Sequence, residues 1–124
     1  MKIILLIVIG CCLSAFYSCG NKKVTEVAKT TIVTNNGVTT ATFKIWGNCE
    51  MCKETIENSL KADGISKADW NIDSKMMTVS FDSTKISLDR VYKNISKVGY
   101  DTEKYKGDDK AYASLPDCCH YERK

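Results

Sequence analysis

The stretch that decides the fold is residues 41–64, which read ATFKIWGNCEMCKETIENSLKADG. Its first part alternates apolar and polar side chains from Ala41 to Ile45, a pattern typical of a half-buried β-strand. Its second part, Lys53–Ala62, lacks Gly and Pro and predicts a helix, which Asp63-Gly64 ends. A strand is therefore followed by a helix, with a loop around Gly47-Asn48 between them.

The residues that follow extend this pattern. Residues 68–72 and 77–81 alternate in the same way and predict two more strands, separated by the turn-forming residues 73–75. Ser87 is a suitable N-cap for a second helix, because its hydroxyl can accept a hydrogen bond from a free backbone amide. The apolar residues after it keep the spacing of a helix face: Leu88, Val91, Tyr92, Ile95 and Val98. Residues 100–106 predict a last, more polar strand.

The predicted order is β-α-β-β-α-β over residues 39–106. It indicates an α+β, ferredoxin-like sandwich with two helices on a four-stranded antiparallel sheet. Upstream, Asn36-Gly37 lies between β-forming residues and is a hairpin signal, with a plain linker as the alternative. The first strand of this topology already has two neighbours, so a hairpin partner is expected beyond the edge of the sheet. Residues 107–124 read as a polar, loop-like tail.

The N-terminal residues resemble a bacterial lipoprotein signal. Lys2 precedes an apolar run over residues 3–9, which is too short for a convincing membrane-spanning helix. We expect cleavage after residue 18 and lipidation of Cys19, with Cys11 as the alternative lipidated cysteine and an uncleaved membrane anchor as a further one. Residues 19–38 then form a tether, which includes the hairpin residues. The protein is expected in the cell envelope, facing the periplasm, and an outer-membrane anchor is favoured because Gly20 is no inner-membrane retention signal.

Composition excludes one class of partner. The 124 residues carry a formal net charge of +3, and no basic stripe with interleaved aromatic residues occurs, so nucleic acid is not expected as a ligand. The chain has 7 cysteines. If Cys19 is acylated, four thiols remain beyond it, in two close pairs that lie far apart in sequence. This spacing does not suit a simple disulfide scaffold.

The first pair, Cys49 and Cys52, lies where the predicted strand is followed by the helix. A helix N-terminus favours thiolate over thiol through its free N–H groups and its partial positive charge, and Lys53 is expected to add to this effect. Thiolates select soft ions such as Cu(I) or Zn(II) over Mg(II) or Ca(II). Two thiolates leave room for a thiolate from a partner, which permits transfer of the ion without its release.

Cys49-x-x-Cys52 followed by Lys53–Glu57, together with residues 97–101 (KVGYD), resembles the heavy-metal-associated domain family of copper chaperones, metal-pump domains and periplasmic mercury-binding proteins. The resemblance implies a metal carrier that is not an enzyme, with a metal-transporting membrane protein as partner. It also implies that Tyr100 shields the site. The family's usual loop methionine is missing, and Trp46 is expected to fill its space and help cover the metal.

The main alternative for Cys49-x-x-Cys52 is an envelope thiol–disulfide oxidoreductase, and a structural disulfide is another. A thioredoxin-like protein needs a cis-proline facing the cysteines. The only proline is Pro116, outside the predicted domain. The order of elements is also different, so metal binding is favoured.

A second cluster, Cys118-Cys119-His120, lies near the end of the sequence. These residues can supply further ligands to the first pair, or form a disulfide or a vicinal redox pair with His120 as a surface residue. Cu(I) is the favoured ion, and Hg(II), Zn(II) and Cd(II) also suit two thiolates. Met51 is interpreted as a contact for a docking partner, with a thioether ligand as the alternative.

Overall fold

The computed structural model describes residues 23–27 and 30–124, so the predicted signal sequence and both candidate lipidation sites, Cys11 and Cys19, lie outside the described residues. The described part contains five strands, three α-helices and a short 3₁₀ turn. In chain order these are β1 (Lys23–Val27), β2 (Thr30–Asn35), β3 (Val38–Lys44), α1 (Glu50–Asn58), β4 (Ile65–Trp70), β5 (Met76–Asp82), α2 (Leu88–Lys97), α3 (Asp109–Ala113) and the turn Asp117–Cys119.

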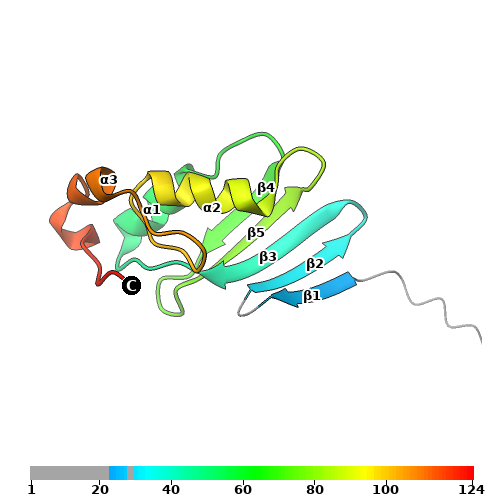
Figure 1. Ribbon diagram of the computed structural model, residues 1–124, viewed down its shortest axis with the longest axis horizontal. Helices are drawn as coiled ribbons and strands as arrows, with labels where there is room; N and C mark the ends of the chain where they lie inside the picture. Colours follow the sequence, from blue (N-terminus) through cyan, green and yellow to red (C-terminus); the bar gives the residue numbers. More distant parts are fainter. Residues whose placement is uncertain (1–22, 28–29) are drawn as a thin grey trace, which may run out of the picture.

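The strands form one antiparallel sheet in the order β1-β2-β3-β5-β4, and α1 and α2 pack on one face of it (Figure 1). The alternation predicted for the first strand is observed in β3, where Ala41 and Phe43 are fully buried. Apolar side chains of both helices cover this face, among them Ile56, Val91 and Ile95, and Leu60, just after α1, completes the core with them. This arrangement confirms the ferredoxin-like class.

The predicted hairpin is confirmed at Asn36-Gly37. Both residues have positive φ, 48° and 82°, and the strands on either side pair from Asn35 with Val38. Its predicted position was wrong, however. β2 pairs directly with β3, through residues 38–42, and so it lies inside the sheet next to the central strand.

The last strand predicted over residues 100–106 was also wrong. This segment makes only an isolated bridge, between Ile45 and Thr102. Since β2 already occupies the edge of β3 as far as Thr42, only the end of β3 is free for pairing. Thr102 then turns the chain back, because its amide donates to the carbonyl of Tyr105 at 2.8 Å.

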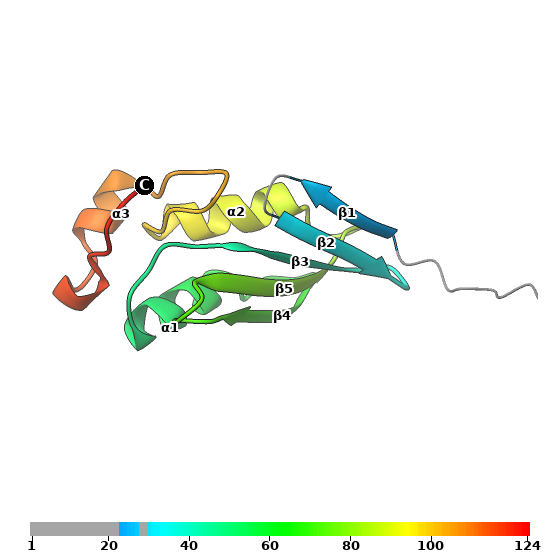
Figure 2. The ribbon, with the colours of Figure 1, turned by 90° about the horizontal axis from the view of Figure 1, so that it is seen from below.

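Residues 107–124 are not the loop-like tail that the sequence indicated, and they are called the C-terminal segment below. They contain α3 and the 3₁₀ turn, and lie at the end of the sheet away from the Asn36-Gly37 turn, near the start of α1 (Figures 1 and 2). Gly99 allows the backbone of the C-terminal segment to pack closely against it. Its φ is +95°, and an added Cβ would lie 2.7 Å from the backbone nitrogen of Tyr112.

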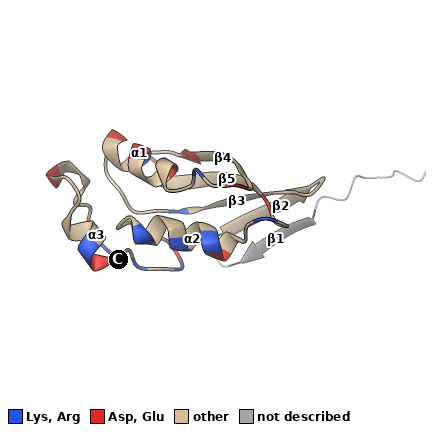
Figure 3. Cartoon of the chain, turned by 90° about the horizontal axis from the view of Figure 1, so that it is seen from above, with Lys and Arg blue, Asp and Glu red and all other residues tan. Residues whose placement is uncertain are grey.

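Charged side chains are divided between the two main helices, with acidic residues prominent on α1 and basic residues on α2 (Figure 3). The partners of many of them lie nearby on the surface, as in the pairs that Asp89 makes with Lys93 and Lys104. Of the helices in the described ranges, none is long and apolar enough to cross a membrane.

Candidate metal centre

The loop between β3 and α1 places the first cysteine pair at a helix N-terminus. α1 begins at Glu50, three residues earlier than the sequence indicated, so that Cys49 is its N-cap and Cys52 lies in its first turn. The two Sγ atoms are 3.5 Å apart. Cys49 is half-buried and Cys52 is fully buried, and the backbone amide of Asn48 donates to the Cys52 sulfur.

The thiol of Cys49 is prepared for ionisation. Burial opposes its ionisation, but hydrogen bonds from the backbone amide and thiol of Cys52 and from the thiols of Cys119 and Cys118 outweigh burial and lower the pKa of Cys49 to about 7. The amide contribution is the one expected of a helix N-terminus. The predicted contribution of Lys53 was wrong. Its ammonium group pairs with Glu57 and with Asp69 on β4.

The C-terminal segment brings the second cysteine pair to the first. The Sγ of Cys49 lies 3.7 Å from that of Cys118 and 3.7 Å from that of Cys119, and the latter two are 3.9 Å apart. The thiol of Cys52 is near enough to Cys119 to raise the pKa of Cys119. All four are free thiols, and they are called the sulfur cluster below.

The spacing of these sulfur atoms suits a metal ion. The triangle formed by Cys49, Cys118 and Cys119 has its centre about 2.2 Å from each sulfur, close to the roughly 2.3 Å of a zinc–thiolate bond. In the metal-free cluster the pKa of Cys119 is raised, first by burial and then by the thiol of Cys52. A soft cation among these sulfurs would offset both effects, because it stabilises the thiolate form.

Buried contacts fasten the C-terminal segment just after the cysteine pair. The hydroxyl of Tyr121 donates to the carbonyl of Gly99 and accepts from the amide of Asp101, both at 2.8 Å. Asp101 is fully buried, and its carboxylate accepts from the guanidinium of Arg123 at 2.8 Å. Asn48, in the loop between β3 and α1, donates a hydrogen bond to the carbonyl of His120. Cys118 and Cys119 are therefore held in place by an anchored segment.

Tyr100 lies beneath the sulfur cluster. Its side chain is fully buried and stacks on Tyr121, and its hydroxyl has no hydrogen-bond partner within the described ranges. Burial raises the pKa of Tyr100, and the neighbouring thiols of Cys52 and Cys119 raise it further. An unpaired buried hydroxyl is costly, whereas a thiolate beside it would be an acceptor.

Trp70, which is fully buried in the core, occupies the position next to the loop that was expected for Trp46. Trp46 does not fill the space under the loop. It lies half-buried with Lys44 and Lys124 over its ring. Trp70 packs there, so closely that a Cβ added to Gly47 would lie 2.8 Å from its ring. Trp70 thus supports the loop where the family's usual methionine is absent.

The side chain of His120 lies away from the sulfur cluster, whereas that of Met51 contacts it. The ring of His120 stacks on Tyr112, with centroids 5.1 Å apart, and His120 is not among the residues whose ligand atoms converge. Met51 is 48% exposed, yet its Sδ lies 3.5 Å from the Sγ of Cys118.

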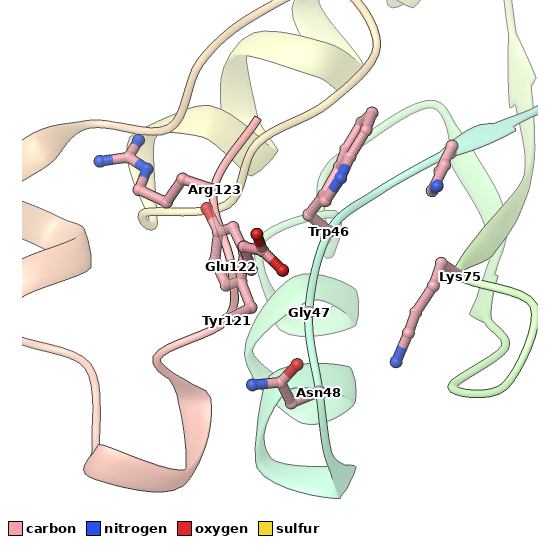
Figure 4. A pocket seen from close by; sticks show the side chains of 8 residues that line it. Trp46, Gly47, Asn48, Lys75, Tyr121, Glu122 and Arg123 are labelled. Carbon is pink, nitrogen blue, oxygen red and sulfur yellow. The ribbon is translucent and has the colours of Figure 1, made fainter.

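An open groove runs beside the loop between β3 and α1. Gly47, Asn48, Tyr121 and Arg123 are among the residues that line it, and Figure 4 shows how their side chains lie. The groove lies between the loop and the last residues of the C-terminal segment, which the sulfur cluster and the hydrogen bond from Asn48 to His120 join.

A ferredoxin-like sandwich with a thiol pair between its first core strand and first helix defines a class of small metal-binding domains. The family model of the heavy-metal-associated domain matches residues 47–101. The chain is 32% identical over 66 residues to a copper chaperone, CopZ, of Staphylococcus saprophyticus, and the match covers 52% of this chain and 97% of that protein. The chain belongs to the heavy-metal-associated domain family.

Two other relatives have different lengths. A copper-exporting P-type ATPase of S. saprophyticus is 33% identical over 85 residues, which is 65% of this chain but only 11% of the ATPase. A solution structure of a proposed copper-ion-binding protein from Bacillus anthracis matches with a TM-score of 0.52 and 25% identity. That match covers 56% of this chain and 100% of the other. The hairpin and the C-terminal segment lie outside the residues that the family model matches.

Proposed function

We propose that the protein binds a soft heavy-metal cation, Cu(I) in the first place, through the thiolates of Cys49 and Cys52, with Cys118 and Cys119 as further ligands. The single observation that carries this proposal is the convergence of the sulfur cluster at the N-terminus of α1. Zn(II), Cd(II) and Hg(II) are the competing ions, since each accepts thiolate ligands. His120 is outside the ligand set, because its ring stacks on Tyr112.

The additional thiols favour retention of the ion. A two-thiolate site is open to an incoming ligand, whereas in this protein the C-terminal segment supplies the extra thiols itself. Transfer to a metal-transporting membrane protein would then require the partner's thiols to replace Cys118 and Cys119. The resemblance to part of a copper-exporting ATPase supports a partner of that kind. We therefore propose capture and sequestration, with transfer only to a partner that displaces the C-terminal segment.

We further propose that this takes place in the cell envelope, facing the periplasm, through a lipid anchor on Cys19. The signal-like sequence of residues 1–18 supports the proposal. Metabolic labelling with a fatty-acid analogue tests it. Label is expected in the wild type and in Cys11→Ser and should be lost in Cys19→Ser. Label that persists in Cys19→Ser and disappears in Cys11→Ser would instead assign the anchor to Cys11.

An anaerobic titration with Cu(I) against a strong Cu(I) chelator tests the metal-binding proposal. The wild type is expected to compete with the chelator, and Cys49→Ser/Cys52→Ser is expected to lose this ability. Cys118→Ser/Cys119→Ser should retain weaker binding, since the first pair remains. If Cys49→Ser/Cys52→Ser binds as tightly as the wild type, the proposed site is wrong. The competing oxidoreductase function predicts that the metal-free protein catalyses insulin reduction, so the same preparations are assayed for it.

A further inference from the structure

Cys118 has a second sulfur neighbour besides the thiols. Its Sγ lies 3.5 Å from the Sδ of Met51 and 3.7 Å from the Sγ of Cys49. Met51 belongs to α1 and Cys118 to the C-terminal segment, so the contact joins parts of the chain that are 67 residues apart. An exposed methionine alone has no special meaning. A thioether that meets a thiol across the fold is different, because both are soft ligands suited to Cu(I).

We propose that Cys118 and Met51, with Cys49 as a bridging thiolate, form a second Cu(I) position, so that one chain binds two ions. This inference rests on the proposed function, in which the sulfur cluster binds one soft ion. With Cys118 engaged by the outer ion, Cys49, Cys52 and Cys119 are left to hold the inner one. Each ion would then have three sulfur ligands.

Burial divides the sulfur atoms into an inner and an outer set. Cys52 and Cys119 are fully buried, whereas Cys118 and Met51 are exposed. Cys49 is half-buried and lies between the two sets. Of the four described cysteines, Cys49 is the one whose sulfur lies within 3.7 Å of the sulfurs of the other three. A bridging ligand needs this central position.

Charge favours a second cation. Four thiolates carry four negative charges, so one Cu(I) leaves three of them uncompensated and two Cu(I) leave two. Repulsion between thiolates less than 4 Å apart is strong where the surroundings are partly buried. Lys53 does not offset it, because its ammonium group is engaged with Glu57 and Asp69. A second monovalent ion at the exposed side of the cluster reduces this repulsion.

Native mass spectrometry of the protein titrated anaerobically with Cu(I) counts the ions directly. The variants are Cys118→Ser, which removes a ligand of the outer position, and Met51→Leu, which keeps size and helix propensity. Met76→Leu on β5 is the matched control, since Met76 has no sulfur contact in the described structure. Circular dichroism confirms that each variant is folded.

The wild type and Met76→Leu are expected to reach two ions in the monomer. Cys118→Ser is expected to stop at one ion, and Met51→Leu to bind the second ion at least about tenfold more weakly, a loss of roughly 1.4 kcal/mol. A single ion in the wild-type monomer, or two ions held equally well by Cys118→Ser, would overturn the second position and leave the proposed function intact. No bound ion in the wild type would overturn both.

Discussion

The Sγ of Cys49 lies 3.7 Å from the Sγ of Cys119, although 70 residues separate them in the chain. One sulfur is on the loop that begins α1, and the other is on a segment fastened by the buried Asp101 and Tyr121. The second thiol pair is therefore part of the folded protein and is delivered to the first by tertiary structure.

Cys119→Ser is expected to weaken Cu(I) binding by at least about tenfold, since it removes a buried thiolate from the inner position. His120→Ala is the control. Its ring stacks on Tyr112, away from the sulfur cluster, so the affinity should stay within about twofold of the wild type, or roughly 0.4 kcal/mol. Competition with a Cu(I) chelator measures both. A larger loss in His120→Ala than in Cys119→Ser would reverse the assignment of ligands.

Tyr121→Phe is expected to lower the free energy of unfolding by about 1–3 kcal/mol. The substitution leaves the carbonyl of Gly99 and the amide of Asp101 buried without their partner. Tyr105→Phe is the control, because its hydroxyl bonds to the more exposed carboxylate of Asp89. Urea denaturation followed by circular dichroism gives both values. Equal losses in the two variants would show that Tyr121 has no special role in fastening the segment.

Low pH is expected to weaken the contacts of Asp101 that fasten the C-terminal segment, and so to lower the free energy of unfolding. Burial alone would raise the pKa of Asp101, but hydrogen bonds from Arg123 and from the amides of Gly107 and Lys124 lower it. A carboxyl whose pKa is lower in the folded state adds stability above its unfolded pKa, about 3.9, and loses it as the pH falls through the folded value. Stability should therefore be constant near neutral pH and fall below about pH 4.

Urea midpoints at pH 7, 5 and 3 measure this effect. Asp101→Asn should flatten the acid part of the profile and lower stability at pH 7, because it removes the charge that faces Arg123. Asp109→Asn is the matched control, since Asp109 also pairs with Arg123 but is largely exposed. An acid profile that is the same in the wild type and Asp101→Asn would exclude Asp101 as its source.

Alkylation of the metal-free protein is expected to begin at Cys49, with a rate that rises with pH around a midpoint of about 7. The reacting species is the thiolate, and the pKa of Cys118 is raised, first by its hydrogen bond with Cys49 and then by burial. Mass spectrometry of iodoacetamide-treated protein locates the label at each pH. Cys49→Ser should abolish the phase near pH 7, and a phase that survives in it belongs to another thiol.

The core of the fold could be predicted from periodicity alone. The alternation in β3 and the spacing of Val91 and Ile95 on α2 each reflect burial of one face, and local sequence records that directly. The missing last strand could not be predicted in this way. Residues 100–106 and the hairpin strand β2 could both pair with the same edge of β3. In the structure β2 occupies that edge along residues 38–42, so residues 100–106 form no strand there.

Part of the candidate site was also accessible from sequence. Cys49 and Cys52 are three residues apart, so their proximity follows from local geometry. The proximity of Cys118 and Cys119 to them depends on the long-range hydrogen bonds of Asp101, Tyr121 and Arg123, which no local sequence pattern indicates. The sequence held one weak sign that this segment packs on the domain. Cys119 and Tyr121 are two residues apart and both are buried, as expected of an extended segment that packs on one side.

X-ray absorption spectroscopy of the Cu(I)-loaded protein tests the central claim most directly, because it reports which atoms surround the metal. We expect sulfur neighbours only, with a coordination number above two that falls to two in Cys118→Ser/Cys119→Ser. Nitrogen or oxygen neighbours in the wild type, or the same coordination number in the wild type and that double variant, would contradict it.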